Sequence, residues 1–211
     1  MAAGRRSRSG GGAILVVLAL IAFALASGGS KKAKAKGGAY MPTGKKLELE
    51  KTARGSSADW ARSRYASALE AVKAAGETDE EKAAEIALSI LTHWSIETGS
   101  GAGEWNYNPG NINATGNQDF VMVHDVDGTM HAQRAFESIH DGAAAYVNLL
   151  RAARYSGAAA LLANNPASSD WFITLGKEGW FDPTAAHSSW DAARSMFENR
   201  RRLLEQYAEG A

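Results

Sequence analysis

The sequence predicts an α+β domain that is mainly α, with one small β-hairpin, preceded by an apolar amino-terminal segment. Apolar residues recur at helical spacing from about residue 57 onward. One stretch, DFVMVHDVDGTMHAQRAF, instead alternates apolar and polar residues around an Asp-Gly pair, a strong hairpin signal. The run AILVVLALIAFALAS near the start of the chain carries no charge. These observations divide the chain into an apolar leader and a helical domain.

The apolar leader, residues 13–29, predicts a transmembrane anchor or a signal peptide. A basic segment, residues 1–12, precedes it, and Ala24-Leu25-Ala26 fits the small-residue pattern at which signal peptidases cleave. With its flanking glycines the run also approaches the roughly 20 residues that span a bilayer. Both interpretations stay open, and both place the rest of the chain outside the cytoplasm. Residues 30–57, rich in Gly, Lys and Ala, predict a flexible linker.

Composition excludes several classes of function. Lys+Arg and Asp+Glu are equal at 23 each, so no overall charge attracts nucleic acid, and we expect no nucleic-acid partner. The absence of cysteine excludes a thiol nucleophile and thiolate metal sites. The histidines show no ligand spacing, so we expect neither a metal nor a cofactor. Residues 58–211 are long enough for one domain with its own core, which we expect to be monomeric.

The helices are predicted from capping residues and apolar periodicity. Ser57 is expected to cap the first helix, and Thr78-Asp79-Glu80-Glu81 and Ser138-Ile139-His140-Asp141 resemble capping boxes. The hairpin is expected to pair residues 120–124 with 129–136. The last helix is expected to bury Leu203 among its apolar residues and to expose its three consecutive arginines. The expected helices cover residues 57–75, 79–97, 138–155, 158–164 and 170–177, with a last one from about 188.

Glu97 is the strongest candidate for a catalytic residue. It follows Ala87, Leu91 and Trp94 on the apolar face of its helix. Burial disfavours the ionised form of a carboxyl group, so a glutamate held there tends to keep a proton that it can donate. Glycines in TGSG end the helix and let other groups approach. An ordinary glutamate turned toward solvent is the alternative interpretation.

The segment between this helix and the hairpin, GAGEWNYNPGNINATGN, combines aromatic rings with amides. Trp105 and Tyr107 offer flat apolar faces, and Asn108 and Asn111 offer amide donors and acceptors. Sugar rings stack on aromatic faces and form hydrogen bonds with amides, so this composition is typical of a carbohydrate site. A loop with buried aromatic anchors is the alternative.

The string ETGSGAGEWNYNPGNI resembles the catalytic segment of glucosaminidases of the flagellar-muramidase type. The resemblance continues through AFESIHDGAAAYVNLLRAARY and, more loosely, WFITLGKEGWFDP, and covers roughly residues 80 to 205. It implies a lysozyme-like fold and cleavage of peptidoglycan glycan strands by a bacterial or phage-borne protein. Glu97 matches the catalytic acid of the family. Asn108, Asn111, Tyr146 and Tyr155 match structural or substrate-contacting positions, and Trp180 is added as a substrate-binding candidate.

The reaction subtype stays open, because the loop Asn-Pro-Gly-Asn replaces the aromatic-glycine pair usual in the glucosaminidases. Glycoside hydrolysis usually needs a second carboxylate, for which Asp125 on the hairpin is the first candidate and Asp119 the second. Without one, a group of the substrate would complete the reaction, as in a lytic transglycosylase. The alternatives to an enzyme are a peptidoglycan-binding module and a structural membrane protein of a virion or envelope. The expected location is the periplasm, the cell wall or the membrane of a phage virion, with residues 13–29 in the membrane.

Overall fold

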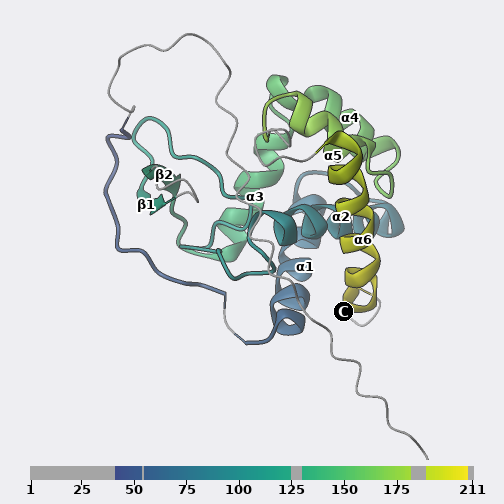
Figure 1. The fold of residues 1–211 in the computed structure, drawn as a ribbon, viewed down its shortest axis with the longest axis horizontal. Coiled ribbons are helices and arrows are strands. Elements are labelled where there is room, and N and C mark those ends of the chain that lie inside the picture. The colour runs from purple at the N-terminus through teal and green to yellow at the C-terminus, as the bar shows by residue number, and fades with distance from the viewer. Residues whose placement is uncertain (1–40, 54, 125–129, 182–188, 209–211) are drawn as a thin grey trace, which may run out of the picture.

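A computed structural model describes residues 41–53, 55–124, 130–181 and 189–208, and the fold there is built around one buried helix, α2 (Figure 1). Every residue of α2 from Ile86 to Ile96 is buried, so the predicted single apolar stripe understates how central this helix is. Helices α1 and α6 both pack against α2, α3 packs against α1, and α4 packs against α5. The elements are α1 (Ser57–Ala74), α2 (Glu80–Glu97), β1 (Phe120–His124), β2 (Met130–Arg134), α3 (Ile139–Leu150), a 3-10 turn η1 (Ala153–Tyr155), α4 (Ser156–Asn164), α5 (Asp170–Lys177) and α6 (Trp190–Ala208).

Capping side chains set where the first helices begin. Ser56, one residue before the predicted cap, forms a reciprocal capping box with Asp59 at the start of α1. Its hydroxyl and backbone N–H both bind that carboxylate, and they lower the pKa of Asp59. Asp79 caps α2 by accepting from the N–H of Lys82. Ser138 caps α3 as predicted, but the helix ends at Leu150, and a 3-10 turn follows where the helix was expected to continue.

The hairpin has a neighbouring segment on each side. Strands β1 and β2 are antiparallel, with Met122 opposite Ala132, and the predicted turn at residues 125–129 lies outside the described residues. Residues 45–47 lie parallel to the start of β1, where the N–H of Leu47 donates to Phe120 O at 2.8 Å. Residues 112–114 lie along β2, where the N–H of Arg134 donates to Ile112 O at 2.8 Å. The hairpin is therefore the middle of a wider set of extended segments.

Part of the predicted linker belongs to the folded domain. Residues 43–52, here named the strap, run from the hairpin to the start of α1 (Figure 1). The side chain of Asn106 clamps the strap by accepting from Glu50 N at 2.9 Å and donating to Glu48 O at 3.0 Å. The composition of the strap does not predict that it is ordered, because main-chain groups make most of its hydrogen bonds to the domain. The leader at residues 13–29 lies outside the described residues, and within them no helix is long and apolar enough to cross a membrane.

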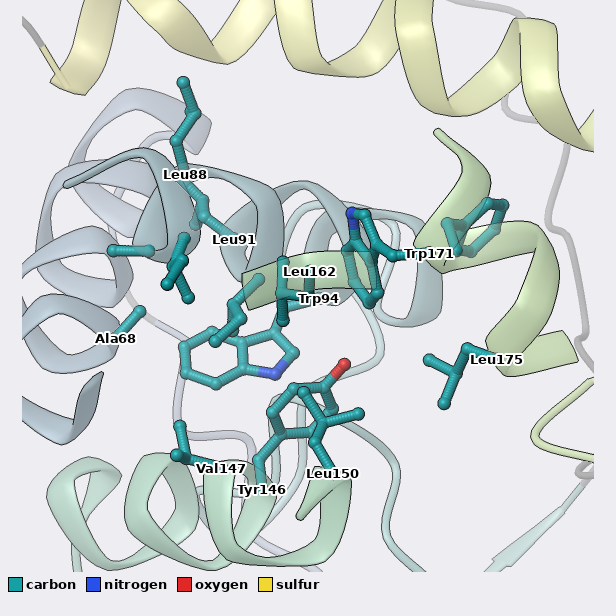
Figure 2. Close-up of a cluster of buried hydrophobic side chains, with 14 of the residues drawn as sticks. Ala68, Leu88, Leu91, Trp94, Tyr146, Val147, Leu150, Leu162, Trp171 and Leu175 are labelled. Atoms are coloured by element: carbon teal, nitrogen blue, oxygen red, sulfur yellow. The ribbon is translucent and has the colours of Figure 1, made fainter. Parts of the chain in front are cut away.

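The core lies between α2 and α3 and continues into α5. Figure 2 shows Trp94 and Tyr146 together in this core, and their rings meet edge to face with centroids 5.4 Å apart. Burying aromatic side chains of this size contributes much of the stability of a small domain. The core therefore joins α2 and α3, which carry Trp94 and Tyr146, to α5.

The prediction for the last helix is wrong at two positions. Leu203 is 61% exposed, whereas Arg201 is only 6% exposed. The buried stripe of α6 passes through Phe197, Arg201 and Leu204, and Leu203 falls outside it. Arg201 can occupy the stripe because its guanidinium pairs with Glu85 and donates to Ser89 Oγ at 2.7 Å, both on α2.

Candidate active site

Glu97 is the last residue of α2, and its side chain is only 4% exposed. The helix ends there because the residues that follow Thr98 leave the helical conformation, with positive φ at Gly99, Ser100 and Gly101. A Cβ on Gly101 would lie 2.5 Å from the Trp60 ring, so the close approach predicted for these glycines occurs. The carboxyl group of Glu97 is thus held at a rigid helix end, nearly shielded from water.

Among the residues that the structure describes, one side chain forms a hydrogen bond with the carboxyl group of Glu97. His93, one helical turn earlier, places Nε2 at 2.9 Å from Glu97 Oε1. Nδ1 of the same ring forms a hydrogen bond with the hydroxyl of Tyr146 on α3. Both His93 and Tyr146 are 0% exposed. Burial and the nearby charge of Glu97 raise the pKa of Tyr146 well above its usual value, so the hydroxyl keeps its proton.

The loop after α2 is held against the main-chain carbonyl group of Glu97. Asn111 donates from Nδ2 to the Glu97 carbonyl oxygen at 2.8 Å. Asn108 is 0% exposed, and its amide donates to Ile112 O and Arg134 O and accepts from Ile112 N. Asn108 therefore joins the loop to β2. A Cβ on Gly110 would lie 2.4 Å from the Tyr146 ring, which shows how closely this loop packs on α3.

A cleft of about 380 Å³ lies beside these residues. Asn111 lines it, as do Tyr155 and Trp180, whose ring centroids lie 5.2 Å apart. Trp180 also packs edge to face on His93, with centroids 5.5 Å apart, so the cleft adjoins the residues that hold Glu97. Among the described residues the lining includes amides, hydroxyls and two guanidinium groups but no carboxylate: Asn111, Ile112, Asn113, Thr115, Gln118, Arg134, Ala145, Leu149, Arg154, Tyr155, Gly179 and Trp180.

The structure brings together only some of the predicted site residues. Asn111, Tyr155 and Trp180 line the cleft, and Tyr146 reaches Glu97 through His93. Asn108 and Tyr146 lie at structural rather than substrate-contacting positions, because neither has exposed surface for a ligand. Burial raises the pKa of Tyr155 above its usual value, which keeps a neutral hydroxyl in the cleft wall.

Trp105 and Tyr107 lie on the strap side of the loop. Trp105 forms a β-bridge with Lys51, and the N–H of Tyr107 donates to Thr52 Oγ1 at 3.0 Å. Tyr107 has a φ of 55°, an unusual value for an aromatic residue, and the strap contact helps to hold it.

The candidates for a second carboxylate are not joined to Glu97 by any described contact. Asp125 lies outside the described residues. Asp119 lies at the start of the hairpin, where its Oδ1 accepts from Lys45 N at 2.9 Å. The contact of Asp119 therefore fixes the strap.

Sequence reasoning missed two residues that organise the site. His93 lies one helical turn before Glu97, a spacing that places both on one helix face, but the sequence suggests only an incomplete zinc motif there and favours a surface or core histidine. Glu104 is 0% exposed and pairs with Arg64, while Trp60 Nε1 donates to it at 2.8 Å. No local sequence pattern predicted that Glu104 is buried and paired, because its partners come from α1 and the strap.

No family model and no curated protein sequence matches the chain. Among solved structures, the chain is similar to the glycoside hydrolase domain of FlgJ from Salmonella typhimurium, at 20% identity and a TM-score of 0.49. The match covers 74% of this chain and 92% of that one. A glycoside hydrolase domain is also what the sequence resemblance pointed to. At this identity the likeness does not assign the chain an activity.

Proposed function

We propose that this protein cleaves the glycan strand of bacterial peptidoglycan, that its helical domain is lysozyme-like, and that Glu97 is the general acid. The observation that carries the proposal is the carboxyl group of Glu97, nearly shielded from water at a helix end. Glu97 does not itself line the described cleft, but Asn111, which donates to its carbonyl oxygen, and Trp180, which packs on His93, both do. Among the described residues, His93 is the one side chain that holds a hydrogen bond to this carboxyl group. The other oxygen is thus available to carry a proton to a glycosidic oxygen.

The cleft suits an anionic glycan. Its amides can bind hydroxyl and acetamido groups, and Tyr155 and Trp180 supply aromatic surface. Arg134 and Arg154 are the charged residues among the described residues of the lining, and guanidinium groups bind carboxylates well. The peptide side chains of peptidoglycan carry carboxylates, whereas a neutral polysaccharide does not. The charge of the cleft therefore favours peptidoglycan as the substrate.

Exchange of Glu97 for Gln tests the proposal directly. Glu97→Gln keeps the size and hydrogen-bonding capacity of the side chain but removes the transferable proton, so we expect cleavage to fall about 10²- to 10⁴-fold. The measurement is release of soluble fragments from labelled peptidoglycan. Glu81→Gln, at the exposed opposite end of α2, is the matched control and should cleave normally.

One result would contradict the role of Glu97, and another would contradict the enzyme assignment. Full activity of Glu97→Gln would exclude Glu97 as the acid. An inactive wild-type protein that still sediments with peptidoglycan would favour the binding-module alternative.

The products identify the reaction subtype. If Asp125 activates water, fragments end in reducing sugars, and the end sugar names the bond that is cut. If a hydroxyl group of the substrate attacks instead, the fragments end in anhydro sugars and the protein is a lytic transglycosylase. Mass spectrometry of the fragments distinguishes these outcomes, and Asp125→Asn should abolish activity only in the first case.

We also propose that residues 13–29 hold the protein at a membrane, with the domain facing the periplasm or cell wall. The uncharged run behind a basic segment supports this. Membrane fractionation with amino-terminal sequencing tests it. An intact amino terminus in the membrane fraction indicates an anchor, a new terminus near Ala26 indicates a signal peptide, and an intact soluble protein contradicts both.

A further inference from the structure

His93 is placed as the middle of a three-residue chain that ends at Glu97. Its Nε2 lies 2.9 Å from Glu97 Oε1, and its Nδ1 bonds to the Tyr146 hydroxyl. The three groups come from two helices, α2 and α3, which are joined here through the site. Because both ring nitrogens are used, the position of the proton on the imidazole decides what Glu97 receives.

The hydroxyl of Tyr146 sets that proton position. A phenol that keeps its proton needs an acceptor, and His93 Nδ1 is the hydrogen-bond partner of this hydroxyl among the described residues. If Tyr146 donates to Nδ1, a neutral imidazole carries its proton on Nε2. The Nε2–H then donates to Glu97 Oε1.

Surrounding aromatic rings prevent His93 from turning away. The rings of Trp171, Phe172 and Trp180 meet it edge to face, with centroids 5.9, 5.5 and 5.5 Å away. Phe181 closes a further side at 6.4 Å. A fully buried imidazole in such a wall has one orientation, so its hydrogen bond to Glu97 has a fixed direction.

We propose that His93 is a positioning residue for the general acid: it fixes Glu97 Oε1 through Nε2–H, so that Oε2 carries the transferable proton toward the substrate. This proposal rests on the proposed function. The proton on Oε2 passes to the glycosidic oxygen, whose bond to the anomeric carbon breaks and leaves the electron pair on that oxygen. Water, or a hydroxyl group of the substrate, then adds to the anomeric carbon. Its released proton goes to Asp125 if that carboxylate activates the water, and otherwise returns to Oε2.

The hydrogen bond from His93 is strongest when the proton has left Glu97. A donor to a carboxylate binds about twice as strongly as a donor to a neutral carboxyl group. The His93 N–H therefore stabilises the negative charge that develops as Glu97 gives up its proton. An interaction that strengthens in the transition state raises kcat rather than substrate affinity.

Substitutions at His93 and Tyr146 in the full chain test the proposal. We expect His93→Leu to lower kcat about tenfold to a hundredfold, the equivalent in rate of one hydrogen bond to a charged group, with little change in KM. His93→Gln, whose amide can still donate, should recover part of the loss. Tyr146→Phe should lower kcat by less, because the ring stays and only the tautomer preference is lost. His140→Gln, at a histidine 59% exposed on α3, is the matched control.

The tautomer of His93 can be measured by spectroscopy, which tests the proposal without relying on enzymatic activity. Nitrogen-15 NMR of histidine-labelled wild type should show His93 protonated on Nε2 and not on Nδ1, and Tyr146→Phe should weaken that preference. A proton on Nδ1 alone, or equal kcat for wild type and His93→Leu, would overturn the role of His93. Loss of activity in Glu97→Gln alongside such a result would leave the proposed function standing, whereas an active Glu97→Gln would remove Glu97 as the general acid.

Discussion

Glu104 and Glu97 are two shielded carboxylates whose surroundings give them opposite roles. Glu104 receives hydrogen bonds on both oxygens, from Arg64, Trp60 and Thr52. Such a carboxylate is committed to structure, since every acceptor position is occupied. Within the described part of the chain, side chains bind Glu97 through one carboxyl oxygen only, so the other oxygen stays available for chemistry. The number of donors around each group, rather than burial alone, separates the structural acid from the candidate catalytic one.

The pair of Glu104 and Arg64 should be strongly coupled. Glu104→Gln leaves a buried guanidinium without its counter-charge, and we expect a loss of about 3–5 kcal/mol in the free energy of unfolding. Adding Arg64→Met removes that unpaired charge, so the double variant should lose less than the two single losses combined. Urea unfolding measures all three. Glu80→Gln, which breaks an exposed ion pair with Lys73, should barely move the midpoint, and additive losses at Glu104 and Arg64 would refute the coupling.

At this scale the sequence predicted the acid but not its surroundings. Glu97 was found from the apolar positions just before it on one helix, which is local information. The hydrogen-bonded series that begins at Glu97 and His93 ends at the hydroxyl of Tyr146. Tyr146 lies 53 residues after His93, and only tertiary packing brings the two together. Asn111 was predicted in the loop, but the direction of its amide toward the Glu97 carbonyl depends on a left-handed φ of 49° that composition does not show.

Among the elements, those with capping signals were predicted best. Helix α2 begins beside its predicted cap, because the hydrogen bond of Asp79 at the first turn decides this point. Helix α5 has the predicted bounds although Ser169 makes no side-chain capping bond there. The strap was missed because its Gly- and Lys-rich neighbourhood is typical of linkers. Its partners are backbone atoms of β1 and of the loop after α2, which leave no trace in side-chain composition.

Gly110 links the loop to α3, and its replacement should disturb the site. A Cβ in Gly110→Ala would lie 2.4 Å from the Tyr146 ring, so the loop or the ring must move. Since Asn111 is the next residue, we expect its bond to the Glu97 carbonyl to loosen and activity to fall by about tenfold. The control is Gly103→Ala, where the nearest atom would be 3.7 Å away and activity should stay near wild type. Equal activity of both variants would show that the loop tolerates the shift.

For the whole molecule, alkaline pH should reveal the buried phenol. Folding raises the pKa of Tyr146, so the folded state keeps a proton that the unfolded chain releases above pH of about 10. The free energy of unfolding should therefore fall as pH rises above that value. Below that pH the contribution of the Tyr146 hydroxyl to the free energy of unfolding is fully present. Tyr146→Phe should show a shallower alkaline decline in urea unfolding from pH 8 to 11, and parallel curves for the two proteins would contradict this.

The strap should contribute to the stability of the whole domain. A chain beginning at residue 41 retains the bonds of Leu47 to β1 and of Thr52 to Glu104, whereas one beginning at residue 55 loses them. We expect the shorter chain to melt at a lower temperature by several degrees, since about 1 kcal/mol shifts the melting point of a domain this size by roughly 2–8 °C. Calorimetry of the two chains measures the difference. Identical melting temperatures would mean that the strap rests on the domain without stabilising it.

The route of the strap also fixes how a mechanical load would enter the protein. A pull applied on the amino-terminal side of residue 43 would meet the hairpin edge first, then the turn around Asn106 and the carboxylate of Glu104, before any tension reached α1. Those contacts brace the backbone that leads to Asn111. If the amino terminus were attached to one structure while the domain bound another, tension on the amino-terminal segment would therefore deform the loop that carries Asn111 before it unfolded the helices.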